Sequence, residues 1–393
     1  MWCTVALDLV GFGIVLPILP LYAKRFHASS LTSTLLIAAF SAASMVASPL
    51  WGRLSDRVGR KPVLLISLVG TAVGSLLTGL AGSIALLFVA RVLDGVSGAS
   101  IAVAQASVGD LAAPEDRPRL FGLLGAAFGV GFVAGPALGS LASLGGARLP
   151  FLVAAGLAVI NAVVGLRTIP ETRPEPVPPA TPVVAAGQTA QGRRPRWPVL
   201  DAQVVTLIVV AFAALVAFSG FESTFALFGH RHLGLGIGSA AAVFTAAGAV
   251  IVVVEGGLIH PLTARFGERA TLRAGLAGNV VGLALLAFAH SWALAVPALL
   301  ALTVGQGLVQ PSMSSALAAR ADPARRGALL GVQQSASALA RVVGPALGGV
   351  LLGSAVSGRP YLVGAALSAL ALAVALRPLP VAEPTGFPDV TVG

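Results

Sequence analysis

Residues 52–62 read GRLSDRVGRKP and hold five charged side chains in eleven residues. The segments on either side, FSAASMVASPLW at 40–51 and VLLISLVGTAVG at 63–74, are almost wholly apolar. Charged residues make up only 10% of the chain, so their concentration here needs a physical reason. A short polar connection between two segments that each cross a lipid bilayer supplies that reason.

The composition indicates that the solvent of this fold is lipid. The chain has 393 residues, of which 56% are hydrophobic, and its mean hydropathy is +0.92. Soluble domains are about 45–50% apolar, because a surface that faces water must be polar. Apolar runs of about 20 residues recur along the chain and fit membrane helices, whereas strands of a membrane barrel need only about 9–11 residues.

We therefore predict an all-α membrane protein with twelve transmembrane helices in two pseudo-symmetric six-helix bundles. The expected spans are 3–23, 31–52, 62–82, 84–106, 119–142, 148–167, 202–228, 238–260, 271–289, 293–316, 326–353 and 360–377. Pro favours extended backbone and marks the connection between the sixth and seventh spans. The predicted domains are an N-terminal bundle at 1–167, a cytoplasmic Pro/Arg-rich linker at 168–200, a C-terminal bundle at 201–380 and a tail at 381–393.

The basic residues are interpreted as a topology signal. The net charge is +10, but nucleic-acid binding requires a contiguous basic face, and the Lys and Arg residues stand in short loops instead. Of the 25 basic residues, 18 fall in the loops of one side, 5 in those of the other side and 2 within spans. The positive-inside rule then predicts cytoplasmic N- and C-termini.

The two halves of the sequence repeat each other. Three motifs recur at similar offsets: AGPALGS (134–140) as VGPALGG (343–349), PEDRPRLFGLLG (114–125) as DPARRGALLG (322–331), and LSDRVGRK (54–61) as LTARFGER (262–269). Six helices separate each copy from its repeat, so the two halves have the same orientation about an axis along the membrane normal. Transporters of this build hold their substrate between the halves.

These residues resemble the major facilitator superfamily, and within it the twelve-span drug:proton antiporters that include the tetracycline exporters. GRLSDRVGRKP resembles the signature of the loop between the second and third helices. Further resemblances are TVALDLVGFGIVLPILPLY at 4–22, LFVARVLDGVSGAS at 87–100 and GVGFVAGPALGS at 129–140. The resemblance covers essentially the whole chain and implies two bundles that rock past each other around a central substrate site.

The stretch at 52–62 is expected to bias the equilibrium between the outward- and inward-facing states. Its motif residues are Gly52, Asp56, Arg57, Gly59, Arg60, Lys61 and the distant Asp110. Gly52 and Gly59 permit a sharp turn. The resemblance implies that Asp56 faces the positive N-terminal end of span eleven and that Arg60 reaches Asp110. Alternatively the basic residues only obey the positive-inside rule, to which Asp56 contributes nothing.

Six ionisable residues fall in the interior of the expected spans, away from the span ends. They are Asp8, Arg91, Asp94, Glu222, Glu255 and Arg341. Insertion into the membrane costs about 2.5–3.5 kcal/mol for each charge, so such residues are functional candidates by default. A buried carboxylate that binds and releases a proton near neutral pH can couple transport to a proton gradient.

In the first half, the resemblance implies that Asp8 handles substrate or protons and that Arg91 takes part in proton transfer. Asp8 alternatively lies close enough to the inner surface to be solvated. Arg91 and Asp94 share one helix face at i and i+3 spacing. Since Arg does not lose its proton, it would act by tuning a carboxylate, Asp94 or Asp8. The alternative is a structural Arg91–Asp94 pair.

In the second half, Glu222 is the strongest proton-site candidate. Four phenylalanines flank it, at positions 218, 221, 225 and 228, and an acid beside aromatic rings suits amphipathic cations. A hydrogen-bonded structural role is the alternative. Glu255 and Arg341 are interpreted mainly as a structural pair across the second half, with proton or substrate handling as the alternative.

The fifth span carries the antiporter helix motif. The residues that match it are Gly131, Gly135, Pro136 and Gly139. Small residues four apart let helices approach closely in lipid, and Pro bends a helix. Such a helix could seal the contact between the halves while they rock, or it could serve ordinary close packing.

The function predicted from these observations is proton-driven export of small amphipathic compounds by alternating access. The tetracycline exporters carry acids in spans three and nine, where this chain has Gly74 and Gly278 or Asn279, which weighs against tetracycline itself. The alternatives are a dedicated metabolite or sugar carrier and a non-transporting membrane sensor.

The remaining expectations concern partners and chemistry. The sequence contains no nucleophile elbow, phosphate loop or metal-ligand spacing, and Cys3 is the single cysteine, so we expect no enzyme, no catalytic residues, no metal and no cofactor. The proton gradient is the expected energy source. The expected partners are an amphipathic small molecule and the bilayer, with no nucleic acid. We expect a monomer in the bacterial cytoplasmic membrane.

The gating motif gives a first prediction. The substitution Asp56→Asn should leave membrane insertion intact and lower transport, because it removes the charge that distinguishes the two states without changing the basic residues that set topology. Expression in the membrane fraction and the initial rate of substrate flux measure the two effects. Normal transport by a well-expressed Asp56→Asn protein would refute the gating role.

Overall fold

The computed structural model describes residues 2–98, 103–104, 117–169, 202–320, 326–353 and 357–377. Within these ranges it contains helices and no strand. Eleven helical segments are long and apolar enough to cross a membrane, and a further helix, α4, is described over 14 residues. These helices confirm the predicted helical membrane fold.

The first bundle contains six of the helices. They are α1 (Trp2–Ala23), α2 (Ser30–Val58), α3 (Arg60–Leu80), α4 (Ile84–Ser97), α6 (Arg117–Ser143) and α7 (Leu149–Thr168), with a short 3-10 turn η1 (Lys24–Phe26) after α1. Within this bundle α1 packs against α6 and α7, and α4 packs against α2 and α3.

The second bundle contains the helices after the linker. They are α8 (Ala202–His232), α9 (Ile237–Val253), the π-helical turn η2 (Val254–Leu258), α10 (Ile259–Phe266), α11 (Glu268–Ala287), α12 (Trp292–Arg320), α13 (Arg326–Leu352) and α14 (Arg359–Leu376). Helix α9, η2 and α10 form one continuous span of 30 residues, Ile237–Phe266. The predicted linker at 168–200 and tail at 381–393 lie almost wholly outside the described residues, so the domain boundaries stay predictions.

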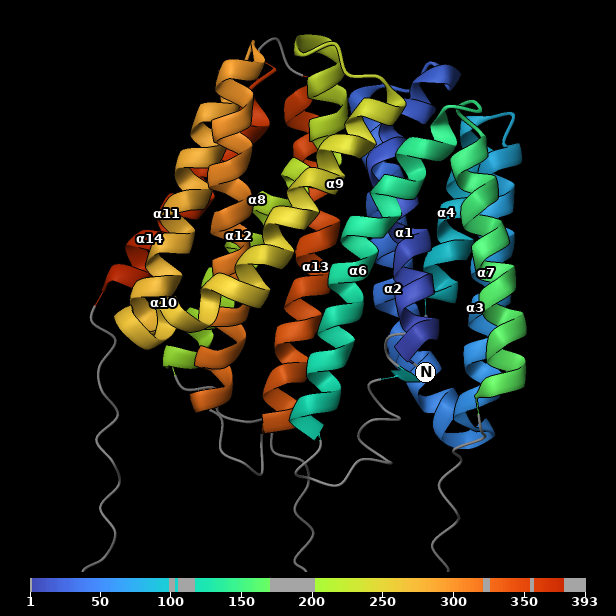
Figure 1. Ribbon diagram of the computed structural model, residues 1–393, viewed down its shortest axis with the longest axis horizontal. Coiled ribbons are helices and arrows are strands. Elements are labelled where there is room, and N and C mark those ends of the chain that lie inside the picture. The colour runs from blue at the N-terminus through green and yellow to red at the C-terminus, as the bar shows by residue number, and fades with distance from the viewer. Residues whose placement is uncertain are drawn as a thin grey trace, which may run out of the picture.

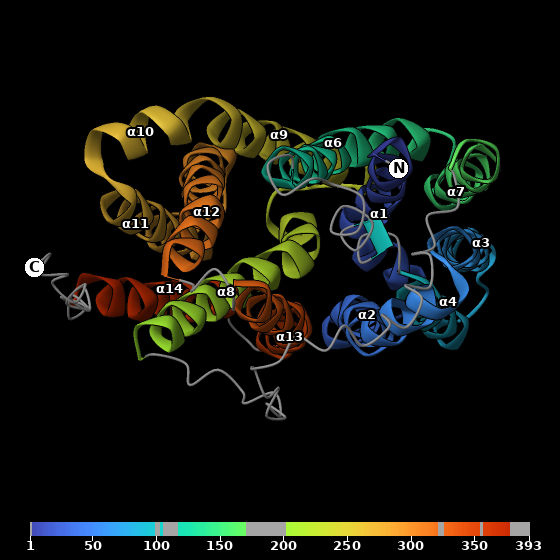
Figure 2. The same ribbon diagram turned by 90° about the horizontal axis from the view of Figure 1, so that it is seen from below.

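The helices run between two ends of the molecule (Figure 1). We call the end that holds Trp2, Thr168, Ala202 and Leu376 the linker end, and the opposite end, which holds Ser30, Ser143, His232 and Leu352, the far end. Figure 2, seen from the linker end, shows the helices α1–α7 side by side with the helices α8–α14. Across the boundary α2 packs on α13 and α6 packs on α9.

The two bundles are joined at the far end. One buried apolar cluster adds Leu21 of α1 to residues of α8 and α9, and another adds Ala241 of α9 to residues of α1. Arg231 Nη2 donates a hydrogen bond of 2.8 Å to Ser30 Oγ across the same boundary. Among the described residues the clusters at the linker end, around Leu124 and around Met313, each stay within one bundle.

The stretch at 52–62 is more helical than expected. Instead of a loop over 52–62, α2 continues to Val58 and α3 begins at Arg60, because a helix that leaves the membrane can continue in water. Gly59 is the whole turn, with φ 104°, a value that favours glycine. The prediction that Gly52 takes part in the turn is wrong, since it lies inside α2.

The second bundle repeats this turn. Gly267, with φ 80°, is the one residue between α10 and α11. The amide of Gly59 donates to Ser55 O at 3.1 Å, and the amide of Gly267 donates to Thr263 O at 2.9 Å. The weak sequence match between 54–61 and 262–269 therefore corresponds to one backbone geometry.

Helices α1 and α6 cross at glycines. A Cβ atom added to Gly135 would lie 2.7 Å from the Cα of Gly13 and from Val10 O. In the second bundle a Cβ on Gly344 would lie 2.7 Å from Val216 O and 2.9 Å from Gly220 N. Backbone meets backbone at both crossings, which agrees with the close packing expected of the motif in the fifth span.

Two glycines of α6 provide a matched test of this crossing. Gly135→Ala should lower stability by about 1–3 kcal/mol, because its methyl group meets backbone atoms that cannot move aside. Gly125→Ala is the control, since nothing lies within 4 Å of its added Cβ. Melting temperatures of the purified proteins in detergent compare the two. Equal melting temperatures would show that the crossing tolerates a separation of the helices.

Candidate functional site

The first bundle holds a buried ion pair on α4. Arg91 Nη1 lies 3.0 Å from Asp94 Oδ2, and both side chains are almost completely shielded. Arg91 Nη2 also donates to Thr78 Oγ1 of α3 at 2.9 Å, and Asp94 accepts a hydrogen bond from the Thr71 side chain. The predicted i and i+3 pairing is thus present, and α3 supplies two hydroxyl groups to it.

The second bundle has the same helix crossing without the charges. A Cβ on Gly74 would meet Asp94 and the carbonyl of Ala90, and a Cβ on Gly282 would meet Leu302 and the carbonyl of Ala298. Each residue of the second set lies 208 positions after its counterpart, so Leu302 corresponds to Asp94 and Leu299 to Arg91. Both leucines are buried. The crossing itself therefore does not require an ion pair.

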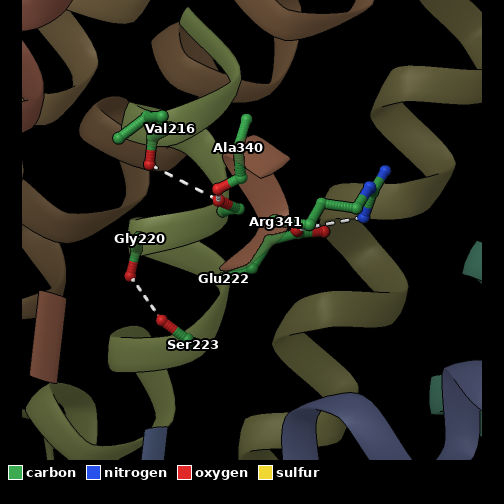
Figure 3. A network of polar contacts seen from close by, with 7 residues as sticks. Val216, Gly220, Glu222, Ser223, Ala340 and Arg341 are labelled. Atoms are coloured by element: carbon green, nitrogen blue, oxygen red, sulfur yellow. Dashed lines mark hydrogen bonds and ion pairs between the residues drawn. The ribbon is translucent and has the colours of Figure 1, made fainter. Parts of the chain in front are cut away.

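The second bundle places its own charge pair between α8 and α13. Figure 3 shows Glu222 and Arg341 pointing toward each other, with Glu222 Oε2 3.8 Å from Arg341 Nη1. Glu222 is 5% exposed, whereas the Arg341 side chain is 38% exposed. One turn away, Ser219 Oγ donates to Ala340 O at 3.0 Å and links the same two helices.

This geometry corrects one expectation. Arg341 contacts Glu222 and not Glu255, because α13 packs along α8. Glu255 is exposed and lies in the π-helical turn η2. The neighbouring Gly256 and Gly257 have open space around them. Turns of π-helix are often found at functional sites, and this one could not be read from the sequence pattern.

The phenylalanines near Glu222 pack mainly against other aromatic rings. Phe221 lies 5.7 Å from Phe218, 5.3 Å from Phe225 and 6.2 Å from Phe244 of α9, measured between ring centroids. Phe228 makes an edge contact of 4.9 Å with Tyr361. These rings are buried against one another, so they do not present open faces to a cation.

The other predicted site residues are placed less completely. Asp8 is half-buried in α1, six residues from the linker end of that helix. Arg60 is buried and donates to Ser55 Oγ at 2.5 Å. The side chain of Asp56 and all of Asp110 lie outside the described residues, so their gating contacts stay predictions.

Two polar partners were missed by the sequence analysis. Thr78 and Ser219 carry no distinguishing signal, since hydroxyl residues are common in membrane helices and only packing selects these two. Asn279, noted at a position where an acid was expected, donates from Nδ2 to Gln306 Oε1 at 3.3 Å inside the second bundle. Within the described ranges no group of three His, Cys, Asp or Glu residues could hold a metal ion.

The leucines of the second bundle define a test of the Arg91–Asp94 pair. Asp94→Asn should destabilise the protein by about 3–5 kcal/mol, because it leaves a buried charge without its partner. The double substitution Arg91→Leu and Asp94→Leu copies the second bundle and should restore most of that stability. Melting temperatures compare stability, and substrate flux by the double variant separates a structural pair from a functional one. A double variant less stable than Asp94→Asn would contradict this interpretation.

Comparison with known proteins gives matches along the whole chain. A family model described as Major Facilitator Superfamily matches residues 1–262 and 256–392. The tetracycline resistance protein, class C, of Escherichia coli is 33% identical over 378 residues, which cover 93% of this chain and 92% of the relative. Multidrug resistance protein 1 of Bacillus subtilis (strain 168) is 28% identical over 343 residues, 87% of this chain and 86% of the relative.

Solved structures agree with the fold. The human organic anion transporter MFSD10 (TETRAN) has a TM-score of 0.67 at 25% identity and covers 95% of this chain and 97% of its own. A bacterial homolog of the human lysosomal transporter Spinster, in an inward-facing and occupied conformation, has a TM-score of 0.75 at 14% identity, with 95% and 94% covered. The second likeness concerns the fold alone.

Proposed function

Because the chain belongs to the major facilitator superfamily, we propose that it exports small amphipathic drugs across the cytoplasmic membrane in exchange for protons. The similarity to proteins named for tetracycline resistance and multidrug resistance over nearly the whole length supports this substrate class. The observation that carries proton coupling is the buried carboxylate in each bundle, Asp94 and Glu222.

The Glu222–Arg341 pair suits a proton switch. A separation of 3.8 Å exceeds the 2.7–3.2 Å of a good hydrogen bond, so the pair is loose. A proton arriving on Glu222 cancels its charge and frees Arg341, whose guanidinium is already partly exposed. A cationic substrate and a proton would then compete for one carboxylate, which is the condition for exchange.

The orientation proposed for the cycle follows from the basic residues. Most of the Lys and Arg residues that the structure describes lie at the linker end, and the positive-inside rule assigns such an end to the cytoplasm. Both termini are then cytoplasmic. With the bundles joined at the far end by Arg231 and Ser30, the conformation described here corresponds to an inward-facing state that takes up cytoplasmic substrate.

The proposed cycle uses the parts of one chain. Both bundles, the two charge pairs and the boundary at α2–α13 and α6–α9 belong to a single polypeptide, so we propose a monomeric carrier. The energy comes from the proton gradient, and no step in the cycle calls for a bound cofactor or for covalent chemistry.

Inverted membrane vesicles test this function. Addition of a cationic dye should release protons from energised vesicles that contain the protein. Tetracycline is tested in parallel, because relatives named for tetracycline resistance are similar along the chain although Gly74 and Asn279 stand where the tetracycline exporters carry acids. The double substitution Asp8→Asn and Glu222→Gln should reduce the exchange at least about tenfold, because Glu222 is the carboxylate for which proton and substrate are proposed to compete and the resemblance implies that Asp8 handles substrate or protons. Asp94 is left intact because its loss would also unpair the buried Arg91. Glu268→Gln, which changes an exposed acid on α11, is the control and should retain it.

Three outcomes would contradict the proposal. Gradient-driven export that survives the double substitution would remove the proton sites from the mechanism. Flux of a sugar or metabolite without drug exchange would identify a dedicated carrier. Absence of any flux in reconstituted liposomes would favour a membrane sensor that uses the same fold.

A further inference from the structure

A cavity lined by basic and apolar side chains lies at the linker end of the second bundle, away from the two charge pairs. A cavity of about 90 Å³ opens there between α8, α11, α12 and α14. Its apolar lining comes from Leu207, Leu272, Ala316 and Ala375, and its charged lining from Glu268, Arg269, Arg273 and Arg377. Three guanidinium groups and one carboxylate thus line the cavity.

Glu268, the single acid of the lining, already accepts a hydrogen bond within the protein. Ser315 Oγ of α12 donates a short hydrogen bond to Glu268 Oε1, which turns this carboxylate toward α12. The cavity also borders the first turn of α11, a 20-residue helix whose N-cap residue, Gly267, makes no side-chain capping bond. Amide groups at a helix N-terminus attract anions. They add to the positive potential that Arg269 and Arg377 create.

Arg273 is fixed in place by the end of α14. Its Nε donates to Ala375 O at 3.0 Å and its Nη2 to Leu376 O at 3.5 Å. These bonds satisfy carbonyl groups that the last turn of a helix leaves unpaired. They also hold a guanidinium, planar and suited to bidentate contact with phosphate, at the wall of the cavity. The cationic lining is therefore partly preorganised rather than a chance gathering of mobile side chains.

The size and depth of the cavity limit its occupant. Pockets for drug-sized ligands measure about 300–1,000 Å³, so a cavity of about 90 Å³ admits a phosphate group rather than a transported drug. Helix α11 is about 30 Å long, the thickness of the hydrocarbon core. Its first turn, which carries Arg269, consequently lies at the level of the lipid headgroups.

We propose that this cavity binds the phosphate group of an anionic phospholipid. The guanidinium groups of Arg269 and Arg377 contact the phosphate, and Leu207, Leu272 and Ala316 contact the adjoining apolar part of the same lipid. Basic pockets between transmembrane helices are known to hold acidic headgroups. A free phosphate ion shares the anionic chemistry, but it would gain nothing from the apolar lining.

The corresponding place in the first bundle carries different charges. At an offset of 208 residues, Arg269 corresponds to Lys61 and Glu268 to Arg60, whereas Arg273 and Arg377 correspond to the apolar Leu65 and Ile169. Arg60 is buried and bonded to Ser55. The first bundle therefore has basic residues at this turn, but it has no counterpart of Arg273, the guanidinium that is held at the wall of the cavity.

Lipid titration of the full-length protein tests the proposal. The purified protein in detergent is melted with increasing phosphatidylglycerol, with phosphatidylcholine or with inorganic phosphate, and the lipid concentration that gives half the rise in melting temperature is recorded. We expect phosphatidylglycerol alone to raise the melting temperature. The double substitution Arg269→Gln and Arg377→Gln should weaken that effect by about tenfold or more. Arg273 is left intact because it also supports α14.

Arg265→Gln is the matched control. This arginine lies at the same end of the same bundle, but it packs over Phe266 and is not part of the cavity lining. Its substitution removes one positive charge, as each of the other two substitutions does, and leaves the lining unchanged. An equal response of the double variant and the wild type would overturn the proposal. So would an equal effect of phosphatidylcholine, whereas an effect of inorganic phosphate that matches phosphatidylglycerol would overturn the lipid as the source of the phosphate. The readout is independent of transport.

Discussion

The structure depends on one constraint, that backbone polar groups in hydrocarbon must find partners within the protein. Long helices meet it, and this is why eleven segments of the described chain span the membrane as helices. In lipid no hydrophobic driving force brings apolar helices together. Their association must therefore come from close van der Waals packing and from buried polar groups. In the first bundle Gly13 and Gly135 allow the close packing of α1 on α6. In the second bundle Ser219 and Arg341 join α8 to α13.

Charges inside this protein follow from the same constraint. An ion that has left water needs a counter-ion and hydrogen bonds, and Arg91 receives both from Asp94 and Thr78. The pair stands where the other bundle has Leu299 and Leu302, so helix packing alone does not account for it. The two repeats thus share the glycine crossings of their backbones, but they differ in their buried charged residues.

The sequence was sufficient for the class of fold, the repeat and the position of the Gly59 turn, because each is written in local composition or in a conformation that only glycine adopts readily. It did not show that α2 continues to Val58, since charged residues are compatible with a helix in water as well as with a loop. It paired Arg341 with Glu255, although Glu222 is the partner. The choice between acids on α8 and α9 is made by tertiary packing, which local patterns do not contain.

The single-residue turns have a mechanical meaning. With only Gly59 between α2 and α3, and only Gly267 between α10 and α11, neither hairpin has any slack. The amide of each glycine is also tied back to the preceding helix. A change in the tilt of α2 at the boundary with α13 is therefore passed to the start of α3 through a single residue. Helix α3 packs on α4 and α7, so such a change would act on the rest of the first bundle.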